Sequence, residues 1–135
     1  MCWAWRELRQ VGWCVRVRDE GKRLGVAELG AELGERATLV QFSSAFCAPC
    51  WATRRILGEV ADLVPGVTHV EIDAEAHLSL VRTLDIVKTP TVLVLDADGR
   101  VVRRAVGQPR KADVIAALGQ AVRVEGPGSI EGPRA

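Results

Sequence analysis

Cys47-Ala48-Pro49-Cys50 stands where an apolar run, Thr38-Leu39-Val40-Gln41-Phe42, gives way to an amphipathic stretch from Cys50 to Val64. The first run predicts a buried strand, and the second has the 3.6-residue period of a helix. Two thiols three positions apart at a helix start can close a disulfide across one turn. The first sulfur then faces unpaired backbone N–H groups and the positive end of the helix dipole, which favour a thiolate over a thiol. The pattern indicates dithiol chemistry at the end of a strand.

The length and composition fit one domain. The chain has 135 residues, of which 48% are hydrophobic, and a chain of this size buries roughly two thirds of its unfolded surface without needing disulfides. The net charge of +1, from 18 basic and 17 acidic residues spread along the chain, gives no electrostatic case for nucleic acid or an anionic membrane. Cys2 and Cys14 lie 33 or more residues from the central pair without framework spacing, so only the central pair is interpreted.

Residues 1–18 combine tryptophans with arginines that interrupt every apolar stretch a signal peptide would need. This segment is compatible with three structures: a peripheral strand, a disordered arm, or an interfacial helix on a membrane surface. We expect an N-terminal extension over 1–23, one folded domain over 24–123 and a disordered tail over 124–135. The expected compartment is the cytoplasm, with membrane association through the N-terminal segment as the alternative.

Strands and helices are expected to alternate through the domain. In chain order, we expect a short helix over 26–33 ending at Gly34, the strand 38–42, the helix 50–64, a strand over 67–72, a helix capped by Asp73, strands over 91–95 and 101–106 joined by a turn at 96–99, and a helix over 111–122. In the two long helices, the apolar positions expected to face inward are Ala52, Ile56, Leu57, Val60, Leu63 and Val64, then Val114, Ile115, Leu118 and Val122.

From about residue 26 to 122, this order of elements resembles the thioredoxin family. The segment Phe42-Ser43-Ser44-Ala45-Phe46-Cys47-Ala48-Pro49-Cys50 is similar to the family's active-site segment, and Thr89-Pro90-Thr91 is similar to its cis-proline loop. The resemblance implies an α/β fold of the thioredoxin-like type, with a central mixed β-sheet flanked by helices on both faces and Cys47 at an exposed tip. It also implies a thiol-disulfide oxidoreductase.

Five positions depart from the family's pattern. Gln41 stands six positions before the first cysteine, where the family has a buried acid, and a neutral amide cannot take the proton that the acid takes. Ser43 replaces an aromatic residue and Ala48 replaces a glycine. Phe46 stands where tryptophan is frequent, and Trp51 where lysine is frequent. These changes are compatible with a dithiol cycle and place efficient coupling to a thioredoxin reductase in question.

The resemblance assigns roles to both motifs. Cys47 is the expected attacking thiolate and Cys50 the resolving thiol. Pro49 removes an N–H donor and stiffens the turn, so replacing it should shift the reduction potential of the cysteine pair. A cis bond at Pro90 would bring the backbone of Thr89 near the sulfurs, where it can pair with an extended substrate segment.

The remaining candidate substrate contacts are Phe46, Ala48, Trp51 and Gly107. Phe46 and Trp51 flank the cysteines, and they form either a docking patch or simple packing. Gly107 either leaves space for a partner, as the resemblance implies, or is an ordinary turn glycine.

His69 falls where the resemblance places a lysine, close to Gln41. It either shuttles the proton of Cys50 or is a partly exposed strand histidine without a catalytic part. His77 is expected at the surface of a helix. A solvated outer face of the redox helix is expected from Arg54, Arg55, Glu59 and Asp62.

The cysteine pair is compatible with two functions other than an oxidoreductase: metal binding and a non-catalytic module. A zinc site needs about four ligands, but Cys2 with Cys14 and His69 with His77 lack the spacing of a second ligand pair. A non-catalytic module that binds partners or senses oxidants through a reversible disulfide is the alternative that the neutral Gln41 supports.

We therefore expect no metal and no cofactor beyond the redox-active pair. The Ala-Pro between the cysteines resembles the reducing members of the family, which favours reduction of protein disulfides. The expected partners are disulfide-containing proteins or small disulfides and an upstream thiol reductant. Nucleic acid is not an expected partner, and the expected state is a monomer.

Overall fold

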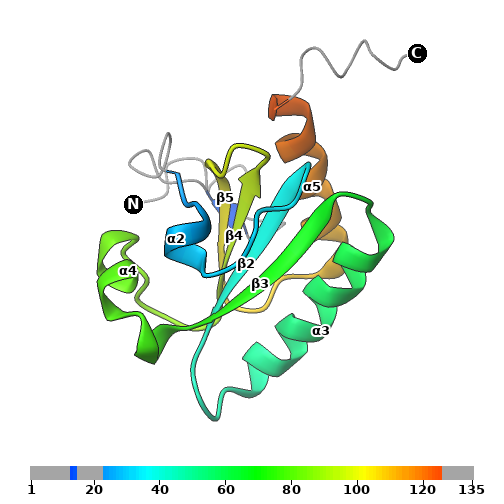
Figure 1. The fold of residues 1–135 in the computed structure, drawn as a ribbon. Coiled ribbons are helices and arrows are strands. Elements are labelled where there is room, and N and C mark those ends of the chain that lie inside the picture. The colour runs from blue at the N-terminus through cyan, green and yellow to red at the C-terminus, as the bar shows by residue number, and fades with distance from the viewer. Residues whose placement is uncertain (1–12, 15–22, 126–135) are drawn as a thin grey trace, which may run out of the picture.

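The computed structural model describes residues 13–14 and 23–125, and its elements follow the predicted order (Figure 1). The strands are β1 (Trp13–Cys14), β2 (Ala37–Ser43), β3 (Val67–Asp73), β4 (Thr91–Asp96) and β5 (Val101–Val106). The helices are α2 (Val26–Leu29), α3 (Ala48–Leu63), the 3-10 helix η3 (Ala74–Ala76), α4 (Leu78–Thr83) and α5 (Lys111–Glu125).

One mixed sheet joins the five strands in the order β1-β5-β4-β2-β3. β2 runs parallel to β3 and antiparallel to β4, and β4 pairs with β5 in an antiparallel hairpin. β2 therefore has a partner on each side, and every one of its residues is buried, as its uninterrupted apolar run predicts. The predicted α/β class with a central mixed sheet is confirmed.

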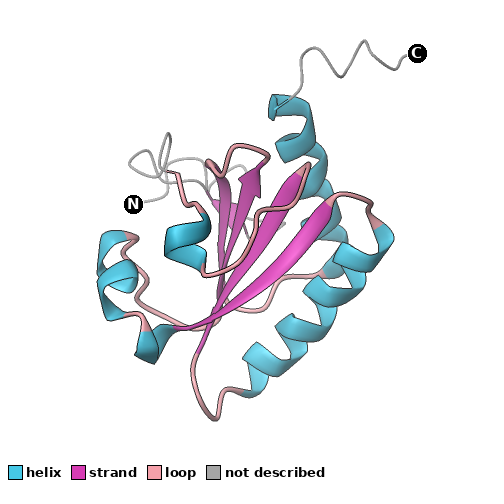
Figure 2. Ribbon diagram, viewed as in Figure 1, coloured by secondary structure: helices cyan, strands magenta, loops and turns pink. Residues whose placement is uncertain are grey.

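Helices cover both faces of this sheet: α3 and α5 lie on one face, and α2 and α4 on the other (Figure 2). The alternation of side chains along β2 divides the core, because Leu39 packs with α3 and α5 while Val40 and Phe42 pack in the opposite cluster. Gln41 shares its face with Leu39. Its side chain is therefore directed towards α3, the helix that carries the cysteines.

The first helix is shorter than the predicted 26–33. Gly30 adopts the left-handed conformation, with φ at 70°, and its N–H donates to the carbonyl of Val26. This C-cap ends α2 at Leu29, so the stop predicted at Gly34 is wrong.

The helix predicted after β3 is divided. Asp73 Oδ1 accepts a hydrogen bond from the Glu75 N–H at 2.9 Å, which confirms Asp73 as an N-cap. The capped turn is the short η3, however, and α4 begins only at Leu78.

Two apolar positions predicted to face inward are exposed instead. Leu63 is the last residue of α3 and is 61% exposed, and Ile115 is 44% exposed. Ile115 is rotated by about 100° from the fully buried Val114, which carries it off the inner stripe of α5. Small side chains, Ala117 and Ala121, complete that stripe and allow α5 to approach the sheet closely.

Residues 1–12, 15–22 and 126–135 lie outside the described part of the chain, so the predicted extension and tail stay predictions. α5 continues to Glu125, past the domain end predicted at residue 123. Of the helices that the structure describes, none combines the length and the apolar character that crossing a bilayer requires.

Candidate active site

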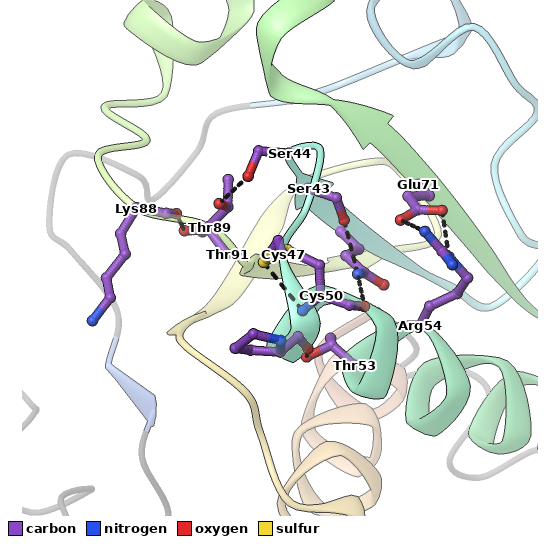
Figure 3. The surroundings of a disulfide bond; sticks show 12 residues. Ser43, Ser44, Cys47, Cys50, Thr53, Arg54, Glu71, Lys88, Thr89 and Thr91 are labelled. Carbon is purple, nitrogen blue, oxygen red and sulfur yellow. Dashed lines mark hydrogen bonds and ion pairs between the residues drawn. A yellow bond between two sulfur atoms is a disulfide. The ribbon is translucent and has the colours of Figure 1, made fainter.

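Cys47 is the N-cap of α3, at the point where the chain leaves β2 (Figure 3). It is bonded to Cys50, with the two Cα atoms 5.2 Å apart. Its side chain is partly exposed, whereas Cys50 is fully buried. The predicted helix start at Cys50 is two residues late, because Ala48 and Pro49 already form the first turn of α3. A proline fits there, since the first N–H groups of a helix have no partner within the helix.

The sulfur of Cys47 lies at the positive end of this helix. The backbone N–H of Cys50 donates to Cys47 Sγ at 3.2 Å and is also close to the Cys47 carbonyl at 3.0 Å. A donor aimed at sulfur stabilises a thiolate more than a thiol, and the helix dipole acts in the same direction. When the disulfide opens, the anionic sulfur is therefore favoured on the accessible cysteine.

The Thr89–Pro90 loop lies beside the cysteines and its peptide bond is cis. The hydroxyls of Ser44 and Thr89 are hydrogen-bonded at 2.8 Å, which ties this loop to the active-site loop (Figure 3). On its other side, the Gly107 N–H donates to the Pro90 carbonyl at 2.8 Å. Gly107 has φ at 93°, a conformation that L residues rarely adopt, and the space where its Cβ would stand is open.

Gln41 lies fully buried beneath the cysteines, with both ends of its amide engaged. Its Nε2 donates to the Cys50 carbonyl at 2.8 Å and to Ser43 Oγ at 2.9 Å. Both amide hydrogens are used in this way, so Oε1 must accept, and its partner is His69 Nε2 at 3.1 Å. The contact fixes the hydrogen of a neutral His69 on Nε2. The structure thus brings His69 next to Gln41, as the resemblance implies.

His69 is half-buried on β3, and burial lowers the pKa of its imidazole below the ordinary value. Two charged groups act on it in opposite directions: Glu71 raises this pKa and Arg54 lowers it. The net shift is downward, so a neutral imidazole is favoured in the folded protein at and above neutral pH.

Arg54 makes a contact that the sequence pattern misses. It is expected on a solvated face with Glu59 and Asp62, but its Nε and Nη2 donate to the two carboxylate oxygens of Glu71, each at 2.8 Å. This hydrogen bond is the main reason that the pKa of Glu71 lies below its ordinary value, and a hydrogen bond from Ser43 acts in the same direction. The ion pair joins α3 to the sheet beside the cysteines (Figure 3).

The candidate substrate contacts differ in exposure: Pro90 is buried, Thr89 and Gly107 are partly buried, and the three on the α3 side are exposed. Phe46 is 96% exposed and has φ at 59°, and Trp51 is 55% exposed. Ala48 is exposed as well. Two further exposed apolar residues, Val87 and Val106, lie near the Thr89–Pro90 loop and are not among the predicted contacts. Val87 stands two positions before Thr89 and Val106 one position before Gly107, and that adjacency is the signal available in the sequence.

A disulfide at the start of a helix, next to a cis-proline loop on a mixed sheet, defines a thiol-disulfide oxidoreductase of the thioredoxin-like class. The chain belongs to the thioredoxin family, since a family model described as a thioredoxin-like domain matches residues 29–122.

Individual thioredoxins resemble the chain in sequence and in structure. The thioredoxin of Mycobacterium tuberculosis (strain ATCC 25618 / H37Rv) is 31% identical over 88 residues, which are 64% of this chain and 75% of that protein. The thioredoxin of Mycolicibacterium smegmatis is 31% identical over 91 residues, 64% of this chain and 80% of that protein. The crystal structure of chloroplastic thioredoxin z is 26% identical, with a TM-score of 0.60 over 71% of this chain and 84% of that one.

Proposed function

We propose that this chain reduces disulfides in proteins or small molecules through the Cys47–Cys50 dithiol. The observation that carries the proposal is the asymmetry of the two sulfurs: Cys47 is partly exposed and receives the Cys50 N–H, while Cys50 is fully buried within bonding reach. An accessible thiolate attacks, and a sheltered thiol resolves.

The reaction passes two electrons to the target. The Cys47 thiolate attacks one sulfur of the target disulfide, the target S–S bond breaks, and the leaving sulfur departs as a thiolate that takes a proton from water. Cys50, once deprotonated, attacks Cys47 Sγ in the resulting mixed disulfide. The second target sulfur leaves as a thiolate, and the Cys47–Cys50 disulfide forms. An external thiol reductant must then return two electrons to this pair.

The proton of Cys50 needs an acceptor, because the amide of Gln41 cannot serve as a base. We assign this role to Nδ1 of His69, because Nε2 already carries the hydrogen bonded to Gln41 and the neutral form of the imidazole is favoured. The rate of mixed-disulfide resolution in His69→Ala should fall and lose part of its pH dependence. A matched His77→Ala variant, on the exposed turn before α4, should keep both, and an unchanged profile in His69→Ala would exclude the role.

Substrate docking is assigned to the exposed residues around the disulfide and to the backbone of the Thr89–Pro90 loop. Phe46, Ala48 and Trp51 offer surface on the α3 side, and Thr89 with Pro90 offers backbone on the other. Beside Pro90, Gly107 leaves open the space that a side chain would occupy. An extended segment that carries the target disulfide can lie across this surface and pair with the Thr89 backbone as a short strand.

The direct test is to trap the mixed disulfide. Cys50→Ser should accumulate targets bound through Cys47, whereas Cys47→Ser should accumulate none, and mass spectrometry separates the two outcomes. Wild-type protein should also reduce insulin with dithiothreitol as reductant, and its reduction potential should be measured against glutathione. Failure to trap or reduce any disulfide would overturn the proposed function.

A redox sensor or adaptor is the second candidate, because Gln41 removes the acidic group that would deprotonate the resolving thiol. A reversible Cys47–Cys50 disulfide with negligible insulin turnover would support this candidate over the reductase.

A further inference from the structure

A recess of about 350 Å³ borders the loop that leads from β2 to Cys47, and Trp51, the residue after Cys50, lines it. Its lining comes from the loop, from α3 and from the end of β3: Ser43, Ser44, Ala45, Trp51, Arg54, Glu71 and Asp73. Figure 3 shows Arg54 and Glu71 on the opposite side of the Cys47–Cys50 pair from Thr89. If a substrate is held by the Thr89–Pro90 loop and bonded to Cys47, the residues that continue past the cysteine pair can reach this recess.

The recess exists because the loop supplies only small side chains. Ser43 stands where the resemblance places an aromatic residue, and Ser44 and Ala45 follow it. The Ser43 hydroxyl is turned inward, with the residue 6% exposed, and it is fixed by the donated hydrogen bond from Gln41. The space that a large ring would fill is left open to solvent.

The charges around the recess favour a cation. Arg54 and Glu71 neutralise each other through two hydrogen bonds of 2.8 Å. The exposed carboxylate of Asp73 remains, with Oδ1 engaged by the Glu75 N–H, so the lining has a net charge of −1. Trp51 forms another wall with its half-exposed indole, a ring that attracts a cation placed over its face.

We propose that this recess receives the basic side chain, arginine or lysine, of a substrate residue that flanks the reacting cysteine. The inference rests on the proposed function and names its substrate class. A guanidinium or ammonium can pair with the Asp73 carboxylate beside the Trp51 indole without disturbing an existing hydrogen bond. An acidic side chain would face Asp73 and would have to separate Arg54 from Glu71.

Rates of reduction of synthetic peptide disulfides test the proposal. The peptides share one sequence and carry arginine, alanine or glutamate at each of three residues on either side of the cysteine. Reduced wild-type protein should prefer arginine over alanine by about threefold to tenfold in at least one position, the range that a partly exposed ion pair with an aromatic face supports. Glutamate at that position should be the slowest, and 0.5 M salt should weaken the preference.

Two variants should move the preference in opposite directions. Asp73→Asn keeps an oxygen that can cap η3 and removes the charge, so the arginine preference should fall below about twofold. Arg54→Gln removes the ion-pair partner of Glu71 and should increase the preference. Asp62→Asn, an equal charge change at an exposed position two turns further along α3, should leave the preference as in wild type.

The possible failures are distinguishable. If wild-type protein reduces arginine, alanine and glutamate peptides at equal rates at every position, the recess has no such role and the proposed function stands. A preference that survives Asp73→Asn also overturns the inference. If neither the peptides nor insulin are reduced, the proposed function is wrong, and the inference that rests on it is wrong as well.

Discussion

Gln41 is fully buried, and its amide bonds the Cys50 carbonyl, Ser43 and His69 at once. Two of these bonds need a donor at Gln41, and a carboxylate has none. The amide is therefore well suited to hold the start of α3 in place and poorly suited to accept a proton. The neighbouring histidine is left as the titratable group of this cluster.

Gln41→Glu should reveal this division of roles. At pH 8 the buried carboxylate faces the Cys50 carbonyl without a hydrogen to donate, so the free energy of unfolding should fall by about 2 kcal/mol. The loss should shrink as the pH falls and the carboxyl becomes protonated. Urea unfolding at pH 8 and pH 5 measures both values. Gln120→Glu, an exposed position on α5, should change stability little, and equal stability of the two variants at pH 8 would contradict the prediction.

His69 should titrate below its ordinary value of 6.5, and NMR titration of the ring protons measures this pKa. Because Glu71 raises the pKa and Arg54 lowers it, Glu71→Gln should lower the pKa further and Arg54→Gln should raise it. Asp62→Asn, again as a control, should leave it unchanged. Opposite shifts would show that another group dominates.

The same shift has a consequence for stability. The unfolded chain binds the His69 proton more readily than the folded chain. The free energy of unfolding therefore rises with pH between the folded pKa and 6.5, and this contribution is lost as the pH falls through the same window. His69→Gln should flatten this part of the pH profile.

At the scale of elements, α3 positions one cysteine outside and the other inside. Reduced protein should therefore be alkylated by iodoacetamide at Cys47 at least about tenfold faster than at Cys50, since reactivity follows thiolate character and access. Mass spectrometry after brief labelling gives the ratio, with urea-unfolded protein as the control in which the two rates converge. Equal rates in the folded protein would contradict the assigned roles.

α4 and β5 are joined by Arg104, which is 2% exposed and donates to the carbonyls of Leu84 and Asp85 beyond the end of α4. Arg104→Met would remove these donors, and the buried Leu84 carbonyl would lose its hydrogen bond from the guanidinium, so the free energy of unfolding should fall by about 2–4 kcal/mol. Arg103→Met is the matched control, since Arg103 is only half-buried and should change stability by less than about 1 kcal/mol. Denaturant unfolding that ranks the two variants equally would contradict this role.

At the scale of the whole molecule, the two faces of the sheet hold separate core clusters. Leu57→Ala on the α3 side and Leu93→Ala on the α4 side should each cost about 2–5 kcal/mol, and the two losses should add in the double variant. Leu63→Ala, at an exposed position of α3, should cost less than about 0.5 kcal/mol. Strong non-additivity in the double variant would indicate that the faces are coupled.

The sequence predicts most of this architecture because its periods are local. The uninterrupted apolar run of β2 and the repeating apolar positions of α3 each appear within one short segment. The proximity of His69 to Gln41 follows from the resemblance, which places both on neighbouring strands.

The contacts that the sequence misses are long-range or competitive. Arg54 pairs with Glu71, 17 residues away, although Glu59 lies nearer in the sequence, and Ser44 meets Thr89 across 45 residues. The early end of α2 depends on Gly30, which competes with Gly34 as a stop signal; of the two, Gly30 is the one in the left-handed conformation. Spacing along the chain does not rank such alternatives, because the folded sheet decides which groups meet.

Among the strands that the structure describes, β3 is the last on its side of the sheet, and its exposed positions carry Glu71 and Asp73, with Arg54 reaching over from α3. An edge strand offers unpaired backbone groups to any other extended chain, and charged side chains discourage that addition. The acidic side chains at this edge should therefore also reduce aggregation at high protein concentration.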